Sequence, residues 1–226
     1  MKIKCCRSCK SKSISKVFDL GKQALTGVFP QNKKEKIDRG SLVMVYCKKC
    51  SLLQLGDSFN PNKMYGKNYG YMSSQNQSMI NHLKNKLNKL KRLTSLKKGD
   101  IVLDIGSNDG TFLNFFNNKF NLIGIDPSAK RLRKYYRKDV KLITEFFNYK
   151  SVKNYLKQKK AKIITTISMF YDLDDPIKFA NDIHKSLDEN GIWHLEQSYM
   201  PSMIKNVSYD TICHEHLEYY SLKSIK

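Results

Sequence analysis

The sequence predicts an α/β protein in which a parallel, doubly wound sheet follows a small cysteine-rich domain. Three observations support this fold class: strand-type and helix-type segments alternate after residue 99, a glycine-rich turn follows the first of these strands, and two C-x-x-C pairs lie within the first 60 residues. We expect a metal-binding domain over 1–60, a tyrosine-rich loop and helical connector over 61–98, and a nucleotide-binding domain with the parallel sheet over 99–226.

The elements follow from hydrophobic periodicity. Residues 41–47 form a β-type run, and Ser73 or Ser74 is a suitable cap for a helix that continues to about Leu96. Beyond Gly99, the pattern predicts strands at 101–105, 121–125, 140–143, 162–167 and 191–197, and helices at 111–117, 128–137, 151–158 and 176–187.

Composition restricts the partners. Lys and Arg total 41 and Asp and Glu 20, which gives a formal charge of +21. A nucleic-acid partner would be consistent with such a charge. However, the sequence has 35 Lys and 6 Arg, with 18 Asn and 4 Ala, and AT-rich coding produces this composition, whereas nucleic-acid surfaces usually use Arg as well. The basic residues also extend from Lys2 to Lys226 without clustering. An anionic small substrate, such as a nucleotide-linked one, is also compatible with the charge. No run of about 18 apolar residues and no signal-peptide pattern occurs, so we expect a cytoplasmic protein without a membrane partner.

The cysteines point to a metal. Two C-x-x-C pairs separated by 37 residues can supply four thiolates to a closed, structural Zn²⁺ site. Buried free thiols or a redox pair are the alternative. The expected ligands are Cys6, Cys9, Cys47 and Cys50. Cys5 could replace Cys6, but the C-x-x-C spacing favours Cys6, and Cys213 lies far from both pairs in the sequence.

The segment 101–111 reads as a strand, a tight turn and a helix start. Gly106 and Gly110 allow close backbone approach, and Asp126 ends the next strand 20 residues after Gly106, where an acid can accept hydrogen bonds from ribose hydroxyls. Two further carboxylates near this turn, Asp104 and Asp109, would repel a pyrophosphate. They suit the ammonium and sulfonium groups of S-adenosylmethionine (SAM) better than NAD; a turn that binds no nucleotide is the remaining alternative.

Residues 209–221 concentrate titratable groups, with two histidines, three acids and three tyrosines in 13 residues. This density indicates acid/base chemistry, because histidine can take a proton near neutral pH. A second metal site through His214 and His216, or a solvated polar helix face, would explain the same pattern.

Four segments in order carry a family resemblance: the two C-x-x-C pairs, Tyr69-Gly-Tyr-Met-Ser-Ser74, Val102–Thr111, and Tyr209–His216. Together they resemble the SAM-dependent sugar C-methyltransferases that act on nucleotide-linked 4-keto-deoxysugars. The resemblance implies a zinc-binding amino-terminal domain, a Rossmann-like class I methyltransferase domain and a further carboxy-terminal domain, before which this chain is expected to be truncated.

The resemblance also implies residue roles. His216 is the expected base for the proton next to the ketone, Glu215 and His214 orient or stabilise it, and Tyr69 or Tyr71 contacts the sugar or the enolate. The expected SAM-binding residues are Asp104, Gly106, Ser107, Asn108, Gly110 and Asp126.

Two departures from the family accompany these expectations. Cys213 stands where family members carry a tyrosine, and 168–176 contains no histidine where some members have one. The rival readings are a nucleic-acid methyltransferase and a non-catalytic remnant. The sequence leaves the sugar, the methylated carbon and the oligomeric state open.

Overall fold

The computed structural model describes residues 1–28, 30, 32–65 and 69–226. The chain forms two compact units that are each discontinuous in sequence. The first contains Met1–Gly70, Ser168–Ile177 and Glu196–Lys226, and the second contains Tyr71–Ile167 and Lys178–Leu195. The predicted domain boundaries after residues 60 and 98 describe continuous domains, which these two discontinuous units do not test, so the boundaries stay a prediction.

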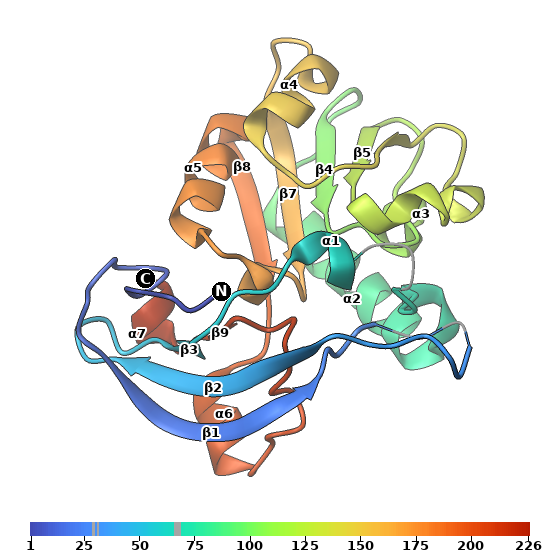
Figure 1. Ribbon diagram of the computed structural model, residues 1–226. Helices are drawn as coiled ribbons and strands as arrows, with labels where there is room; N and C mark the ends of the chain where they lie inside the picture. The colour runs from blue at the N-terminus through green and yellow to red at the C-terminus, as the bar shows by residue number, and fades with distance from the viewer. Residues whose placement is uncertain (29, 31, 66–68) are drawn as a thin grey trace. The chain divides into compact units, whose positions relative to one another are not determined.

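The first unit is built on an antiparallel sheet with the strand order β1-β2-β3-β9 (Figure 1). Its strands are β1 (Ile14–Ala24), β2 (Arg39–Cys47), β3 (Leu53–Leu55) and β9 (Glu218–Tyr219). Strand β9 pairs with β3, with Leu53 opposite Tyr219, so the segment after the two histidines is part of the cysteine-rich module. The core of this sheet consists of Leu42, Met44, Leu55, Leu217 and Tyr219.

Short helices complete the first unit. They are α1 (Pro61–Met64), the 3-10 turn η4 (Phe170–Asp172), α6 (Met200–Lys205) and α7 (Leu222–Ile225).

The second unit contains a five-stranded sheet with the order β6-β5-β4-β7-β8. Its strands are β4 (Ile101–Ile105), β5 (Asn121–Ile125), β6 (Lys141–Ile143), β7 (Ala161–Ile167) and β8 (Leu187–Glu196). Strand β4 pairs in parallel with β5 on one side and with β7 on the other. The chain order therefore reverses at β4, and a crevice at the carboxyl end of such a strand is where doubly wound sheets bind ligands.

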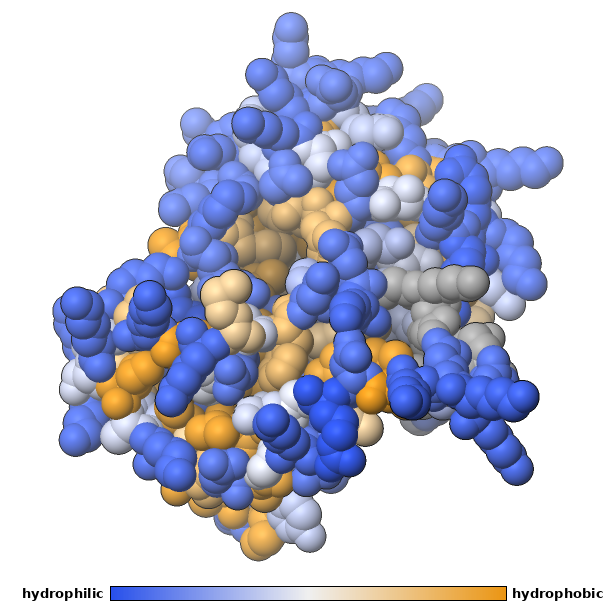
Figure 2. All heavy atoms as spheres, viewed as in Figure 1, coloured by the Kyte–Doolittle hydropathy of each residue, from blue (hydrophilic) through white to orange (hydrophobic). Residues whose placement is uncertain are grey.

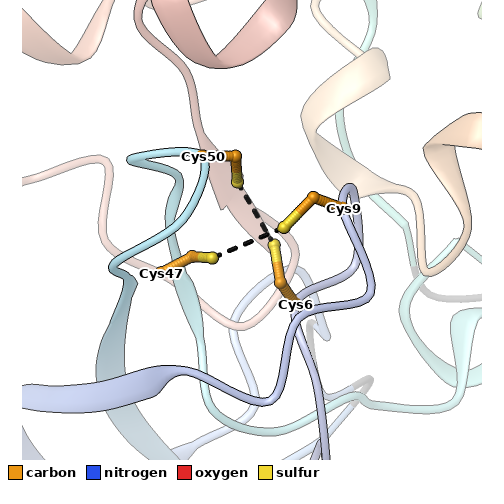
Figure 3. Close-up of side chains that lie close together, drawn as sticks. All are labelled: Cys6, Cys9, Cys47 and Cys50. Atoms are coloured by element: carbon orange, nitrogen blue, oxygen red, sulfur yellow. Dashed lines mark hydrogen bonds between the residues drawn. The ribbon is translucent and has the colours of Figure 1, made fainter.

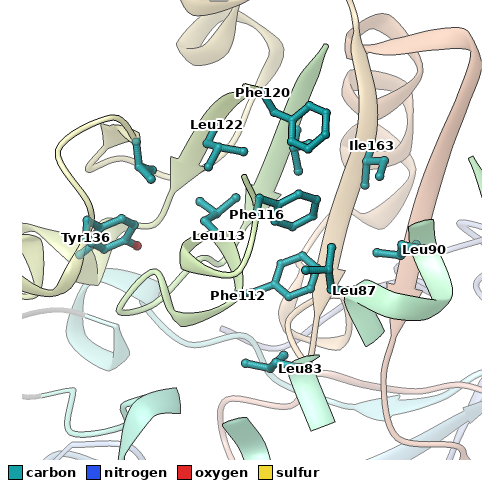
Figure 4. Packing of buried hydrophobic residues seen from close by; sticks show 13 residues of the cluster. Leu83, Leu87, Leu90, Phe112, Leu113, Phe116, Phe120, Leu122, Tyr136 and Ile163 are labelled. Carbon is teal, nitrogen blue, oxygen red and sulfur yellow. The ribbon is translucent and has the colours of Figure 1, made fainter. Parts of the chain in front are cut away.

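Helices and turns connect these strands. They are η1 (Ser73–Gln75), α2 (Gln77–Leu93), α3 (Thr111–Asn114), η2 (Pro127–Lys130), η3 (Arg133–Tyr135), α4 (Tyr149–Leu156) and α5 (Pro176–Ser186). Helix α2 buries Leu83, Leu87 and Leu90 against a core that includes Phe112 and Phe116, whose rings pack edge to face (Figure 4). The leucines recur at steps of three and four, so this apolar stripe gives α2 its single buried face.

The parallel sheet confirms the predicted fold class. Strand β8 begins at Leu187, four residues before the predicted start at Gly191, and larger differences lie at the helices. The predicted start at Ser73 or Ser74 is wrong for the α-helix, because the amides of both serines bond to the side chains of Asn108 and Asp109 instead. Asn76 caps α2 in their place through its side-chain oxygen.

The predicted helix over 128–137 is two 3-10 turns rather than an α-helix. At its start, Asp126 accepts hydrogen bonds from the amide and the hydroxyl of Ser128. At its end, Arg137 donates to the carbonyls of Asn114 and Phe116, which also ends α3 three residues earlier than predicted. Side chains thus take backbone groups that a longer helix would have used.

Hydrophilic residues cover most of the face in view in Figure 2. Among the described residues, no helix combines the length and the hydrophobicity needed to cross a membrane.

Candidate functional sites

Four cysteine thiols converge in the first unit (Figure 3). The sulfur atoms of Cys6, Cys9, Cys47 and Cys50 all lie within 4.8 Å of one another. Cys6 Sγ lies 3.6 Å from Cys50 Sγ, and Cys9 Sγ lies 3.6 Å from Cys47 Sγ. A tetrahedral ion with Zn–S bonds of about 2.3 Å separates its sulfurs by about 3.8 Å, so the cluster has the size that Zn²⁺ requires.

The two C-x-x-C turns have the same backbone. The amide of Lys10 donates to the carbonyl of Cys6 at 3.0 Å, and that of Ser51 donates to Cys47 at 2.9 Å. Both donors adopt the left-handed conformation, with φ of 57° and 65°. This repeated turn aims each pair of thiols at one point, while Gln54 donates from Nε2 to Cys6 Sγ at 3.2 Å.

The glycine turn after β4 is held from several sides. Gly106 and Gly110 have φ of 74° and 76°. A Cβ on Gly110 would lie 2.6 Å from the ring of Tyr136, whose hydroxyl donates to the carbonyl of Asn108 at 2.7 Å and lies 2.9 Å from Ser107 Oγ. Only glycine fits at position 110, and the aromatic ring fixes the backbone of the turn.

Asp126 and Asp104 stand at the ends of neighbouring strands. Asp126 accepts from the amide of Asn108 at 2.8 Å through Oδ2 and from Ser128 through Oδ1, so it fixes the turn as well as offering remaining lone pairs to a ligand. Asp104 is buried and accepts from Thr165 Oγ1 at 2.6 Å. Burial raises the pKa of Asp104 to about 7.

The tyrosine-serine loop is attached to this turn. Asn108 accepts from the amide of Ser73 at 3.0 Å and donates from Nδ2 to the carbonyl of Tyr71 at 3.1 Å, and Asp109 accepts from the amide of Ser74 at 2.8 Å. The loop therefore holds Tyr71 beside the nucleotide turn with a side chain that is 46% exposed. From the sequence, Asp109 was expected only to contribute a negative charge near this turn. In the structure its carboxylate is buried and binds the loop through the amide of Ser74.

His216 lies in the first unit with a defined tautomer. Its Nδ1 is 2.8 Å from the carbonyl oxygen of Thr211, and because a carbonyl can only accept, Nδ1 carries the proton. The lone pair is then on Nε2. Burial lowers the pKa of His216 below 6.5, which keeps the imidazole neutral near pH 7. The ring packs against Tyr171 with centroids 4.4 Å apart. This geometry suits a general base.

His214 is placed differently. Its Nε2 is 3.1 Å from the carbonyl of Gly40 and its Nδ1 is 3.3 Å from the amide of Thr26, so both ring nitrogens are engaged by backbone. The side chain is fully buried and contacts Phe59 edge to face. These contacts suit a residue that holds the segment in position.

Glu215 lies between these histidines, against the backbone at Gly27. A Cβ on Gly27, which has a φ of 74°, would overlap the Glu215 carboxylate. Burial raises the pKa of Glu215, and hydrogen bonds from Thr26 and Cys213 partly offset this rise. Burial also raises the pKa of Cys213 to about 11, so it is a neutral thiol at pH 7.

Two residues that the sequence did not single out complete this cluster. Asp172 on η4 and Tyr65 after α1 have half-buried side chains. Burial raises the pKa of each, and the charge of Glu215 adds to both rises. Tyr69 packs its ring 5.4 Å from that of Tyr65. The structure thus gathers Tyr69 with the His-Glu-His segment in the first unit, and Tyr71 with the nucleotide turn in the second.

The second unit has the sheet order and the glycine turn of a class I methyltransferase, the fold class whose methyl donor is SAM. Residues 76–226 match the sequence family described as "Methyltransferase domain", and residues 6–65 match a domain described as zinc-binding. The chain belongs to this methyltransferase family and carries the zinc-binding domain at its amino-terminal side.

Among curated proteins, the C-methyltransferase NovU of Streptomyces niveus is 27% identical over 186 residues, which is 81% of this chain and 44% of that protein. A tRNA U34 carboxymethyltransferase of Campylobacter lari is 31% identical over 122 residues, 51% of this chain and 41% of that protein. The chain spans less than half the length of these relatives. The plantazolicin methyltransferase BpumL, solved with SAH, shares 17% identity and a TM-score of 0.50, covering 65% of this chain and 60% of BpumL, which supports the fold.

Proposed function

We propose that this chain is a SAM-dependent C-methyltransferase that acts on a nucleotide-linked keto-deoxysugar. The observation that carries the proposal is the neutral His216 with an unprotonated Nε2, which can take a proton from carbon. C-methylation differs from O- or N-methylation in needing such a base, because a C–H group has no lone pair until its proton is removed.

The turn residues are proposed to hold the methyl donor. Asp126 accepts the ribose hydroxyls, and the backbone from Gly106 to Gly110 passes close to the methionine portion, where Asp104 and Asp109 offset its positive charges. The similarity to the C-methyltransferase NovU supports this assignment, and the fold shared with BpumL, solved with SAH, is compatible with it. When bound, SAM supplies an electrophilic methyl group.

His216 is proposed to remove the proton next to the ketone, and Glu215 and the backbone carbonyl of Thr211 to stabilise the imidazolium that results. His214 holds the segment. Tyr69 and Tyr71 remain proposed contacts of the sugar. The four cysteines are proposed to bind a structural Zn²⁺ with no open coordination position.

The zinc-loaded chain should first be titrated calorimetrically with SAM, with NAD as the control ligand. Saturable binding of SAM alone is expected. Exchange of the sugar's alpha proton into D2O is then measured for the wild type, His216→Ala and His184→Ala, whose side chain is exposed. The base substitution should slow exchange by about 10²–10⁴-fold and the control should not. Equal exchange in all three proteins would contradict the role of His216.

A tRNA substrate is the second candidate, favoured by the tRNA U34 carboxymethyltransferase relatives and by the charge of +21. A gel-shift titration with tRNA distinguishes the two. Micromolar binding that weakens by several orders of magnitude between 50 and 200 mM salt, without sugar-proton exchange, would favour tRNA.

A further inference from the structure

The segment from Lys130 to Lys138 is the most basic stretch of the second unit. Six of its nine residues are Lys or Arg, and it holds three of the six arginines of the chain. AT-rich coding raises lysine at the expense of arginine, so it does not explain this segment. Arginine favours phosphate as a ligand, because its planar fork donates two hydrogen bonds to one phosphate group. The exposed basic side chains are those of Lys130, Arg131, Arg133, Lys134 and Lys138.

The two acids that flank this segment in the sequence both have partners already. Asp139 accepts two hydrogen bonds from the guanidinium of Arg137, at 2.9 Å from Nε and 2.5 Å from Nη2. Asp126 is buried and accepts from the amides of Asn108 and Ser128. No other Asp or Glu lies between them in the sequence. The positive charge of the exposed side chains is therefore not offset by acids within the segment, and it can attract a polyanion.

An exposed aromatic ring lies within the same segment. The side chain of Tyr135 is 41% exposed, and Lys134 Nζ lies 5.1 Å from the centre of its ring. Proteins that bind single-stranded nucleic acid combine these two features, because a base can stack on the ring while the phosphates on either side meet the cations.

The backbone that carries Tyr135 is fixed from below. Leu132 and Tyr136 are buried on either side of it. Asn114 Nδ2 donates to the carbonyl of Tyr135 at 2.9 Å, and Arg137 donates to the carbonyl of Asn114 at 3.0 Å. The ring is thus presented by an ordered segment, so little backbone entropy is lost when a base stacks on it.

A second ring with a lysine over it lies next to this contact. Phe115 follows Asn114 in the chain and is partly exposed, and Lys84 Nζ of helix α2 lies 5.4 Å from the centre of its ring. Helix α2 contains no acidic residue. The exposed basic side chains of α2 are Lys84, Lys89, Lys91 and Arg92.

We propose that the surface formed by Lys130–Lys138 and the exposed side of α2 binds single-stranded nucleic acid. Tyr135 stacks on a base, Arg133, Lys134 and Lys138 bind the adjacent phosphates, and the basic residues of α2 bind phosphates further along the strand. RNA and DNA share this chemistry. The surface lies entirely within the second unit, and the inference does not depend on the substrate from which His216 takes a proton.

The test measures binding of fluorescently labelled oligo(U) and oligo(dT) to the zinc-loaded 226-residue chain by anisotropy over a series of salt concentrations. A length of about 12 nucleotides lies within the usual site size for single strands. Inorganic polyphosphate serves as the polyanion without bases. The tighter of the two oligonucleotides identifies the source of the ligand.

Two sets of variants separate stacking from charge. Tyr135→Ala removes the ring and Tyr135→Phe keeps it, and Tyr155→Ala is the matched control at a tyrosine of α4 that is 38% exposed. Replacing Arg133, Lys134 and Lys138 together by Gln removes three positive charges from the proposed surface. The control for charge removes the same number from exposed lysines elsewhere in the second unit, through Lys153→Gln, Lys157→Gln and Lys159→Gln.

Tyr135→Ala should weaken oligonucleotide binding by about 5- to 100-fold, which is the usual contribution of one base stacked on an aromatic ring. Its dependence on salt and its affinity for polyphosphate should match the wild type, because no charge is lost. Tyr135→Phe and Tyr155→Ala should bind as the wild type does. The triple variant at 133, 134 and 138 should lower the slope of log affinity against log salt by roughly 2, since each lost phosphate contact lowers it by about 0.7. The control triple variant should leave the slope unchanged.

Equal affinities in Tyr135→Ala and Tyr155→Ala, or equal slopes in the two triple variants, would overturn the inference, because the chain would then attract nucleic acid only through its overall charge. A wild-type chain that binds neither oligonucleotide at 50 mM salt would overturn it as well. All the substituted side chains are exposed, so the melting temperature and SAM affinity should stay at wild-type values. Proton exchange by His216 is measured separately, so either conclusion can fail without the other.

Discussion

Replacing Gly110 by alanine is expected to weaken both the fold and the binding of SAM, because its Cβ would lie 2.6 Å from the ring of Tyr136. Gly99 is the matched control. It has a similar left-handed backbone, with φ of 86° against 76° for Gly110, and an added Cβ there would meet no atom within 4 Å. Both substitutions lose free energy of unfolding because alanine disfavours a left-handed backbone. Only Gly110→Ala adds a steric overlap, with the ring of Tyr136.

The magnitudes follow from these two terms. A left-handed alanine costs about 1 kcal/mol, and an overlap with a buried ring adds about 1–3 kcal/mol. The free energy of unfolding should therefore fall by about 1 kcal/mol in Gly99→Ala and by about 2–4 kcal/mol in Gly110→Ala. For a chain of this size, each kcal/mol lowers the melting temperature by about 2–4 °C.

The assay is thermal unfolding of both variants, followed by SAM calorimetry below their melting temperatures. Displacing the Tyr136 ring pulls its hydroxyl from the carbonyl of Asn108, which moves the turn. SAM affinity should fall by at least about 10-fold in Gly110→Ala, which corresponds to about 1.4 kcal/mol, and stay unchanged in Gly99→Ala. Equal losses of stability and equal affinities in the two variants would refute the steric argument.

Three further outcomes are expected. Cys50→Ser should lose the bound zinc and melt earlier than the wild type, whereas Cys5→Ser should keep one zinc per chain by metal analysis, and equal zinc contents would contradict the ligand set. The pKa of Asp104 rises from 3.8 in the unfolded chain to about 7 in the fold, so its contribution to stability is complete below about pH 4 and falls as the pH rises through 7. Asp104→Asn should therefore gain unfolding free energy relative to the wild type between pH 5 and 8, by up to about 4 kcal/mol, and parallel urea-denaturation profiles would count against this. Because burial lowers the pKa of His216, exchange of the sugar proton should persist below pH 6.5 and fall only in more acidic buffer, and an acid midpoint above 6.5 would be inconsistent with the buried base.

The parts of the fold that sequence reasoning predicted are those governed by local patterns. Strands β4 and β5 are almost continuous apolar runs, and the chain buries them on both faces, so their bounds could be predicted to the residue. The cysteine cluster could also be predicted, because the C-x-x-C spacing places two thiols in one local turn, whatever the rest of the chain does.

The rest depends on contacts between distant segments. Arg137 donates hydrogen bonds to the carbonyls of Asn114 and Phe116. No local sequence pattern predicts these hydrogen bonds, so the early end of α3 could not be predicted. Asp172 and Tyr65 were missed for the same reason, since one follows β7 and the other follows α1. Only the folded chain shows that the charge of Glu215 contributes to the raised pKa of both. A weak signal did exist: Asp172 lies in 168–176, the segment whose lack of a histidine the sequence had already shown.

The pairing of β3 with β9 has a consequence for how the chain folds during synthesis. Three strands of this sheet come from the first 55 residues, and the fourth, at Glu218–Tyr219, is synthesised about 160 residues later. At 5–20 residues per second, the edge of β3 waits roughly 10 to 30 s on the ribosome without its neighbour. An open strand edge is a template for aggregation, so zinc captured early by the cysteine turns would protect the nascent chain until its last strand arrives.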